Sequence, residues 1–288
     1  MEVRVNNISY AYSGNVVFDA ASFTLHPQKI YGLIGENGAG KTTLISILAG
    51  IQQSPTGEMI NVSNPGLLLQ GVDLYQNLSV MENLQYFALE KGLAFNEVEQ
   101  VLAFTKFPSS HHPKKYKHLS QGYKKRLAIA LSFLTKGNLV LLDEPFSTVD
   151  IPTIRVLKKA LREFVAQTGK TVLISSHQLK EVRDLLDEVL LIKERKVVAV
   201  EAAPHPSVHQ IVLYFDCKDH TAITQLLEMD SRFRLLRKID QTYEIALVQN
   251  CSASDFISKV EEVGLAWSKI EKQPPLEFLF YSTDNDDQ

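Results

Sequence analysis

Long hydrophobic runs are absent from this sequence of 288 residues. Its longest uninterrupted apolar stretches are the short segments 127–131 and 211–215. A membrane-spanning helix needs about 20 predominantly apolar residues, so a chain that crosses a bilayer by itself is excluded. The N-terminal residues 1–6 also lack the apolar core of a signal peptide. We therefore expect a cytoplasmic location.

Cysteine is scarce, and neither sign of charge dominates. The 2 cysteines, Cys217 and Cys251, exclude a disulfide framework, and their spacing is not that of a metal site. Lys and Arg total 30 against 33 Asp and Glu, a net charge of -3, so the chain is not built to coat nucleic acid. A hydrophobic fraction of 45% is typical of a globular protein with one large domain or two unequal ones.

The first 200 residues alternate short apolar runs with amphipathic helical stretches. Continuous apolar runs, rather than alternating ones, indicate strands covered on both faces, as in a parallel sheet. Strands that alternate with helices predict the α/β class. The predicted strands are residues 30–34, 66–69, 139–142, 172–175 and 189–192.

Two breaks interrupt this alternation. Residues 80–134 predict helix after helix, which indicates an inserted helical subdomain at about 75–135. Residues 202–207 contain two prolines and predict a linker. After the linker the order β-α-β-β-α-β predicts a small α+β domain of the ferredoxin-like type. We expect one domain at 1–203 and a second at 208–288.

Residues 35–42 read Gly-Glu-Asn-Gly-Ala-Gly-Lys-Thr, which fits the phosphate-binding P-loop pattern. A predicted strand precedes this loop and a predicted helix at 42–49 follows it. Backbone N–H groups of such a loop, together with the helix N-terminus, bind an anion. Lys41 supplies a charge for the β- and γ-phosphates, and the Thr42 hydroxyl can bind Mg²⁺. The alternative is an ordinary glycine-rich turn.

Two acids, Asp143 and Glu144, end the apolar strand at 139–142. Ligands of a parallel sheet bind at the carboxyl edge of its strands. Asp143 is placed to bind Mg²⁺ through water, and Glu144 to orient or deprotonate an attacking water. The alternative is a pair of surface acids at the end of a strand.

A further motif lies about twenty residues earlier, where residues 119–126 read Leu-Ser-Gln-Gly-Tyr-Lys-Lys-Arg. Ser120 is expected to cap a helix, and Gly122 leaves its backbone N–H accessible in the first turn. The segment therefore predicts a second anion-binding helix terminus. The base-reading tetrapeptide Asn-Lys-x-Asp of guanine-nucleotide switches does not occur in the chain.

With these motifs in this order, residues 1–200 resemble the ATP-binding cassette (ABC) transporter ATPases. The fingerprint of that family is Leu-Ser-Gly-Gly-Gln, from which this chain departs at Gln121 and Tyr123. The resemblance implies that Tyr12, rather than Tyr10, stacks on adenine. It implies Mg²⁺ binding by Thr42, Gln70 and Asp143, and catalytic roles for Glu144, Gln70 and His177. The remaining residues implied to bind ATP are Asn37, Gly38, Ala39, Gly40, Lys41, Thr43, Ser120, Gly122 and Asp150.

The resemblance also implies partners. Ser120 and Gly122 of one cassette would bind the ATP held by a second cassette, so ATP closes a homodimer or a dimer with a paralogue. A separate transmembrane permease would hold the chain at the cytoplasmic face of the membrane, with residues 74–80 as docking surface. The alternative for Leu78 and Val80 is packing within the helical block.

The C-terminal domain and the segment 274–280 are similar to those of single-cassette exporters, which implies ATP-driven export. The alternative function is a soluble ABC-type ATPase that acts on ribosomes or nucleic acid. The basic residues that favour this alternative are Lys114, Lys115, Lys117, Lys124, Lys125 and Arg126. A small-molecule kinase is a third option, which the fingerprint disfavours.

Overall fold

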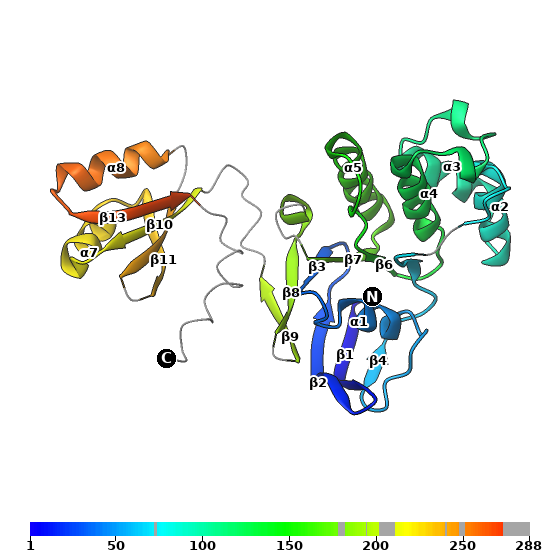
Figure 1. Cartoon of the computed structure of the whole chain (residues 1–288), viewed down its shortest axis with the longest axis horizontal. Helices are drawn as coiled ribbons and strands as arrows, with labels where there is room; N and C mark the ends of the chain where they lie inside the picture. Colours follow the sequence, from blue (N-terminus) through cyan, green and yellow to red (C-terminus); the bar gives the residue numbers. More distant parts are fainter. Residues whose placement is uncertain are drawn as a thin grey trace. The chain divides into compact units, whose positions relative to one another are not determined.

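The computed structural model describes residues 1–71, 74–177, 182–193, 195–201, 211–239, 241–247 and 251–272. The chain divides into two compact units, Met1–Ala202 and Ala203–Gln288 (Figure 1). The linker predicted at 202–207 and the segment 274–280 lie outside the described residues. No helix within the described ranges is long and apolar enough to cross a membrane.

A six-stranded sheet forms the centre of the first unit, in the order β5-β6-β7-β3-β8-β9. All neighbouring strands are parallel except β8 and β9. The sheet confirms the predicted α/β class, and its strands β3, β6 and β7 are buried along their whole length. Its strands are β3 (Ile30–Ile34), β5 (Gly66–Leu68), β6 (Leu139–Asp143), β7 (Thr171–Ser176), β8 (Glu188–Lys193) and β9 (Lys196–Glu201).

A second, antiparallel sheet of the order β2-β1-β4 was not predicted from the sequence. It contains β1 (Val3–Tyr12), β2 (Asn15–Leu25) and β4 (Glu58–Ile60). The helix α1 (Lys41–Leu48) contributes to one apolar core together with both sheets. This core fixes the helix that follows the phosphate loop between the two sheets.

The predicted helical block is confirmed and contains α2 (Val80–Glu90), α3 (Phe95–Phe104) and α4 (Gln121–Phe133). Short 3-10 turns at Ser109–His111 and Tyr116–His118 join α3 to α4. Ser79 begins α2 with a capping box, because its side chain accepts from the Glu82 N–H while Glu82 accepts from the Ser79 N–H. The ring of Phe133 stacks on Phe164 of α5 (Ile151–Thr168), with 3.9 Å between ring centroids.

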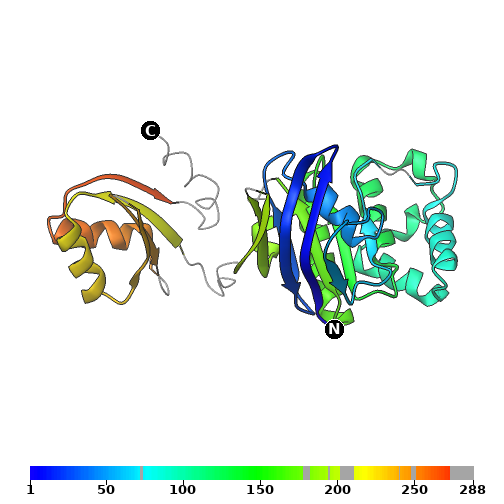
Figure 2. The same cartoon turned by 90° about the horizontal axis from the view of Figure 1, so that it is seen from below.

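The second unit is the predicted ferredoxin-like fold. Its antiparallel sheet has the order β11-β12-β10-β13, and Figure 2 shows both helices on one face of that sheet. The rings of Phe215, Phe233 and Phe256 pack edge-on in its core. Its elements are β10 (Ile211–Cys217), α7 (His220–Met229), β11 (Phe233–Ile239), β12 (Thr242–Leu247), α8 (Ala253–Glu262) and β13 (Trp267–Lys272).

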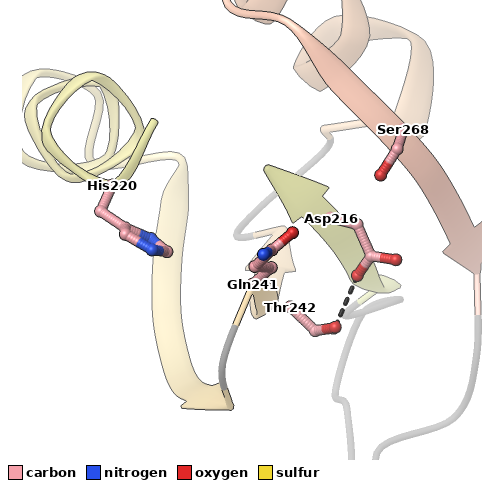
Figure 3. Close-up of a pocket in the computed structure, with 5 residues that line it drawn as sticks. All are labelled: Asp216, His220, Gln241, Thr242 and Ser268. Atoms are coloured by element: carbon pink, nitrogen blue, oxygen red, sulfur yellow. Dashed lines mark hydrogen bonds between the residues drawn. The ribbon is translucent and has the colours of Figure 1, made fainter. Parts of the chain in front are cut away.

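A polar hollow of 550 Å³ lies at one end of the four-stranded sheet of the second unit (Figure 3). The Thr242 hydroxyl donates to Asp216 Oδ1 at 2.5 Å, and the His220 ring is hydrogen-bonded to the Tyr243 hydroxyl. Gln241 and Ser268 complete the lining. The side chains of Asp216, His220 and Thr242 therefore already have hydrogen-bond partners within the second unit.

Candidate functional site

The phosphate loop leaves the carboxyl end of β3 and leads directly into α1. Gly40 occupies the N-cap position, no side chain caps the helix, and no acidic residue lies in its first turn. The N–H groups that begin α1 consequently lack a side-chain partner, and the helix dipole adds positive potential at the same place. This is the arrangement that binds a phosphate group.

Gly40 is required by the geometry of the loop. Its φ is 100°, a region that side chains rarely adopt. A Cβ at this position would lie 2.4 Å from Val17 Cγ1 and 2.7 Å from Phe18 Cζ. The loop therefore packs directly on the β2 strand of the antiparallel sheet, and only glycine permits that approach.

Lys41 is 7% exposed, and its ammonium group donates to the backbone carbonyls of Gly35 (2.8 Å) and Glu36 (3.0 Å). Burial lowers the pKa of Lys41, while the carboxylates of Glu144 and Asp143 act in the opposite direction. The loop thus holds a partly desolvated cation, whose attraction for an anion is stronger than it would be in water.

The first acid, Asp143, is 1% exposed and is hydrogen-bonded through both oxygens. Thr42 Oγ1 donates to Oδ2 at 2.9 Å, and Ser175 Oγ donates to Oδ1 at 2.6 Å. The structure therefore brings together Thr42 and Asp143, two of the three residues predicted to bind Mg²⁺. Ser175 was not predicted as a site residue, although a serine inside an apolar buried strand indicates a polar partner elsewhere in the fold.

The second acid, Glu144, is 9% exposed and has a φ of 47°. Its Oε1 lies 2.8 Å from Nδ1 of His177, which follows the end of β7. Its backbone N–H donates to Ser175 Oγ at 2.9 Å. A carboxylate and an imidazole predicted separately from the sequence are thus in direct contact.

Gln70 lies two residues beyond β5, at the same edge of the sheet as Asp143 and Glu144, because β5 and β6 pair in parallel through Leu68 and Leu142. Its side chain is exposed. The site thus uses the carboxyl ends of β3, β5, β6 and β7, which lie side by side.

Tyr12 ends β1 and is 46% exposed. Gln52 Nε2 donates to its hydroxyl at 2.7 Å, and hydrogen bonds from Gln52 and Thr43 lower the pKa of the Tyr12 phenol. The Tyr10 ring meets the Tyr12 ring edge-on, with 5.0 Å between centroids. Tyr12 therefore lies beside the first turn of α1 with much of its ring exposed for stacking.

Ser120 is the N-cap of α4, as predicted, and accepts from the Tyr123 N–H. A Cβ on Gly122 would lie 3.2 Å from the Thr153 hydroxyl in the first turn of α5. Asp150 is the N-cap of α5 and accepts from the Thr153 N–H. Hydrogen bonds from the side chain and then the backbone of Thr153 lower the Asp150 pKa. The two helix starts consequently lie side by side.

Tyr123, one of the two departures from the family fingerprint, is held by aromatic and cationic neighbours. The His111 ring lies 4.3 Å from the Tyr123 ring between centroids, and the Arg126 guanidinium lies 5.1 Å above it. These contacts stabilise the first turn of α4.

The residues fit a nucleoside triphosphate with Mg²⁺. An uncapped helix start and Lys41 suit phosphate groups. The oxygens of Thr42 and Asp143 are the hard ligands that Mg²⁺ prefers.

Comparison with known proteins decides the family. The model of the ABC transporter family matches residues 18–147. An uncharacterized ABC transporter ATP-binding protein of Methanocaldococcus jannaschii is 33% identical over 200 residues, which cover 68% of this chain and 76% of the relative. This chain belongs to the ABC transporter ATP-binding proteins. As a member it is an ATPase, with ATP as substrate and Mg²⁺ as cofactor.

Other ABC proteins extend this result. The lantibiotic transport ATP-binding protein SrtF of Streptococcus pyogenes is 30% identical over 206 residues, covering 68% of this chain and 89% of the relative. A solved ATP-binding subunit of an ABC transporter is 25% identical, with a TM-score of 0.63 over 70% of this chain and 90% of that one. A dimeric cassette bound to ADP and Pi shares the fold, at 18% identity and a TM-score of 0.61 over 69% of this chain and 98% of that one.

Proposed function

We propose that this chain powers the export of a substrate through a separate transmembrane permease, to which it attaches at the cytoplasmic face of the membrane. The observation that supports this most directly is the set of contacts that joins Thr42, Asp143, Glu144 and His177 at the edge of the sheet. The export direction draws on a relative described as a Nod factor export ATP-binding protein of Burkholderia lata, which is 31% identical over 219 residues, covering 70% of this chain and 71% of the relative. The cassette would occupy residues 1–203 and the smaller domain residues 208–288.

In the proposed reaction, Lys41 and the loop residues Asn37, Gly38, Ala39, Gly40 and Thr43 bind the phosphates of ATP. Thr42, Gln70 and Asp143 would hold Mg²⁺, whose charge would offset that of the transferred phosphoryl group. The adenine would stack on Tyr12, a residue that is 46% exposed.

Glu144 is the proposed general base for the attacking water. Its buried carboxylate is held by His177, so one side of the carboxyl group is fixed in orientation. Hydrogen-bonded positioning of this kind is typical of a base that must meet a single water molecule. His177 would then contact the γ-phosphate through the other side of its ring.

The proposed partner is a second cassette, either an identical chain or a paralogue, with which this chain would form a dimer that closes on ATP. The contacts of Ser120 and Gly122 run to Tyr123 and Thr153 rather than to the phosphate loop. Their exposed helix start would bind ATP held by the other chain, and Asp150 lies beside it. In a head-to-tail dimer, each chain would complete the ATP site of the other, so two composite sites form when the dimer closes.

The proposed permease contact is an aromatic cluster of Tyr75, Tyr86 and Phe87. The Tyr75 and Tyr86 rings meet edge-on at 4.9 Å between centroids, and they are 48% and 43% exposed. Asn83 anchors this segment, since its side chain bonds to the backbone N–H and carbonyl of Tyr75. Val80, by contrast, is fully buried and serves packing. The proposed docking surface therefore keeps Tyr75 of the predicted segment 74–80 and adds Tyr86 and Phe87 of α2, which lie outside that segment.

Purification of the tagged chain from detergent-solubilised membranes tests this function. We expect a polytopic membrane protein to copurify in stoichiometric amounts, and the double variant Tyr75→Ser/Tyr86→Ser to lose it. Phe95→Ser is the matched control, because Phe95 is an exposed aromatic of the same helical block outside the cluster. Copurification with ribosomes, or retention of the membrane protein by the double variant, would contradict the proposal.

A further inference from the structure

Ser175 is fully buried near the end of β7, directly opposite Asp143 in the pairing of β6 with β7. Its hydroxyl makes two hydrogen bonds of opposite direction. It donates to Asp143 Oδ1 at 2.6 Å, and it accepts from the Glu144 N–H at 2.9 Å. One buried hydroxyl thus contacts both acids of the candidate site.

The hydrogen bond from Ser175 gives the two oxygens of the Asp143 carboxylate different partners. Because Oδ1 is occupied by Ser175, Oδ2 is the oxygen directed toward Thr42 of the phosphate loop. A carboxylate bonded at both oxygens cannot rotate freely about its terminal bond. Ser175 consequently decides which oxygen faces the side where Mg²⁺ would bind.

The second bond acts on the backbone of Glu144. A φ of 47° is uncommon for a glutamate and persists where surrounding contacts hold it. The Ser175 hydroxyl fixes the amide on one side of this residue, and His177 fixes the carboxylate on the other. The direction in which the Glu144 side chain leaves the strand therefore depends on Ser175.

We propose that Ser175 is a positioning residue that couples the metal-binding acid to the general base. It sets the orientation of Asp143 and the backbone of Glu144 together, without touching ATP. The inference rests on the roles proposed for these two acids. Groups that orient metal ligands in this way typically change metal affinity or activity by about 10- to 100-fold when they are removed.

The variant Ser175→Ala tests this inference in the full chain. We expect kcat to fall by about 10- to 100-fold with little change in the KM for ATP, because the loop that binds ATP is intact. The Mg²⁺ concentration for half-maximal activity should rise. Ser175→Cys keeps the shape of the side chain, with a slightly larger atom, but replaces a strong hydrogen-bonding group with a weak one. It should therefore lower kcat in the same way, with a near-native melting temperature.

A second readout does not depend on turnover. ATP with EDTA should raise the melting temperature of Ser175→Ala as much as that of the wild type. The additional rise produced by Mg²⁺ should be smaller in the variant. Thr171→Val is the matched control, because Thr171 is a buried residue at the other end of β7 whose hydroxyl bonds to the His26 carbonyl at 3.0 Å. We expect Thr171→Val to lower the melting temperature of the free protein but to keep both the rise produced by ATP with EDTA and the additional rise produced by Mg²⁺.

Two further variants separate the inference from the function on which it rests. If Asp143→Asn and Glu144→Gln abolish turnover while Ser175→Ala and Ser175→Cys retain wild-type kcat and Mg²⁺ response, the inference about Ser175 is wrong and the site stands. If the two acid variants retain turnover, the proposed site itself is wrong. A fall in activity matched by an equal loss of the ATP–EDTA response would show a folding defect and overturn the positioning role.

Discussion

Nδ1 of His177 lies 2.8 Å from Oε1 of Glu144, and so joins the residue after β7 to the residue after β6. The Glu144 side chain is 11% exposed and the His177 side chain is 38% exposed. The carboxylate is therefore held from one side by a ring that remains open to solvent. This pair supports a base that is fixed in place before a nucleotide binds.

Glu144→Gln should reduce kcat by at least about 100-fold, because the amide keeps the shape of the side chain but cannot accept a proton. ATP binding should persist, and size-exclusion chromatography with ATP should show a long-lived dimer. Glu163→Gln is the control, since Glu163 lies in α5 in an ion pair with Lys106. Wild-type hydrolysis by Glu144→Gln would show that another group accepts the proton.

Gly40→Ala should abolish high-affinity ATP binding and lower the free energy of unfolding by about 1–3 kcal/mol, because the new methyl group meets Val17 and Phe18 at a positive φ. Gly50→Ala is a close control. Gly50 also has a positive φ, 73°, but nothing lies within 4 Å of its Cβ position. Isothermal titration with ATP and thermal melting measure both effects. Equal losses in the two variants would mean that the contact with β2 is unimportant.

Ser120→Ala should weaken the ATP-dependent dimer, because Ser120 caps the helix that is proposed to meet ATP of the second chain. The loss of an N-cap costs about 1 kcal/mol of stability. Ser79→Ala removes a comparable cap from α2, where no role in closure is proposed, and serves as control. Both variants should melt earlier, but only Ser120→Ala should shift the dimer equilibrium in the Glu144→Gln background. A stable dimer with Ser120→Ala would place the closing contact elsewhere.

The chemistry of the phosphate loop and the parallel strands could be predicted because their signals are local. Glycine spacing and continuous apolar runs are visible within a few residues, and the strands at 30–34 and 139–142 followed from them. The antiparallel sheet was missed because its pattern is interrupted. The pairing of β1 with β2 shifts register after Val5, Ile8 and Tyr10, which breaks the alternation that identifies a strand.

Contacts across the sheet could not be predicted from one sequence. Ser175 reads as one more residue of a buried strand until the pairing of β6 with β7 places it opposite Asp143. The bond between Glu144 and His177 likewise joins positions 33 residues apart. The local pattern predicted Glu144 and the family resemblance predicted His177, whereas the tertiary structure shows that they touch.

Lys41 leads to a prediction about pH. Burial lowers the pKa of Lys41 below its usual 10.5, with Glu144 and Asp143 opposing the shift. Between the lowered native pKa and 10.5 the unfolded chain binds more protons at this residue, so raising the pH increases the contribution of Lys41 to the free energy of unfolding. The same deprotonation removes the cation that ATP meets, so ATP affinity should fall over that window.

The free energy of unfolding without nucleotide and the affinity for ATP should therefore move in opposite directions as the pH rises toward 10.5. The measurement compares wild type with Lys41→Met by thermal melting and by ATP titration across this range. Lys41→Met should bind ATP weakly at every pH, and the difference in melting temperature between the two proteins should shift in favour of the wild type as pH rises. Because other buried lysines titrate equally in both proteins, this difference isolates Lys41. Constant ATP affinity of the wild type up to pH 10.5 would contradict the role of the Lys41 charge.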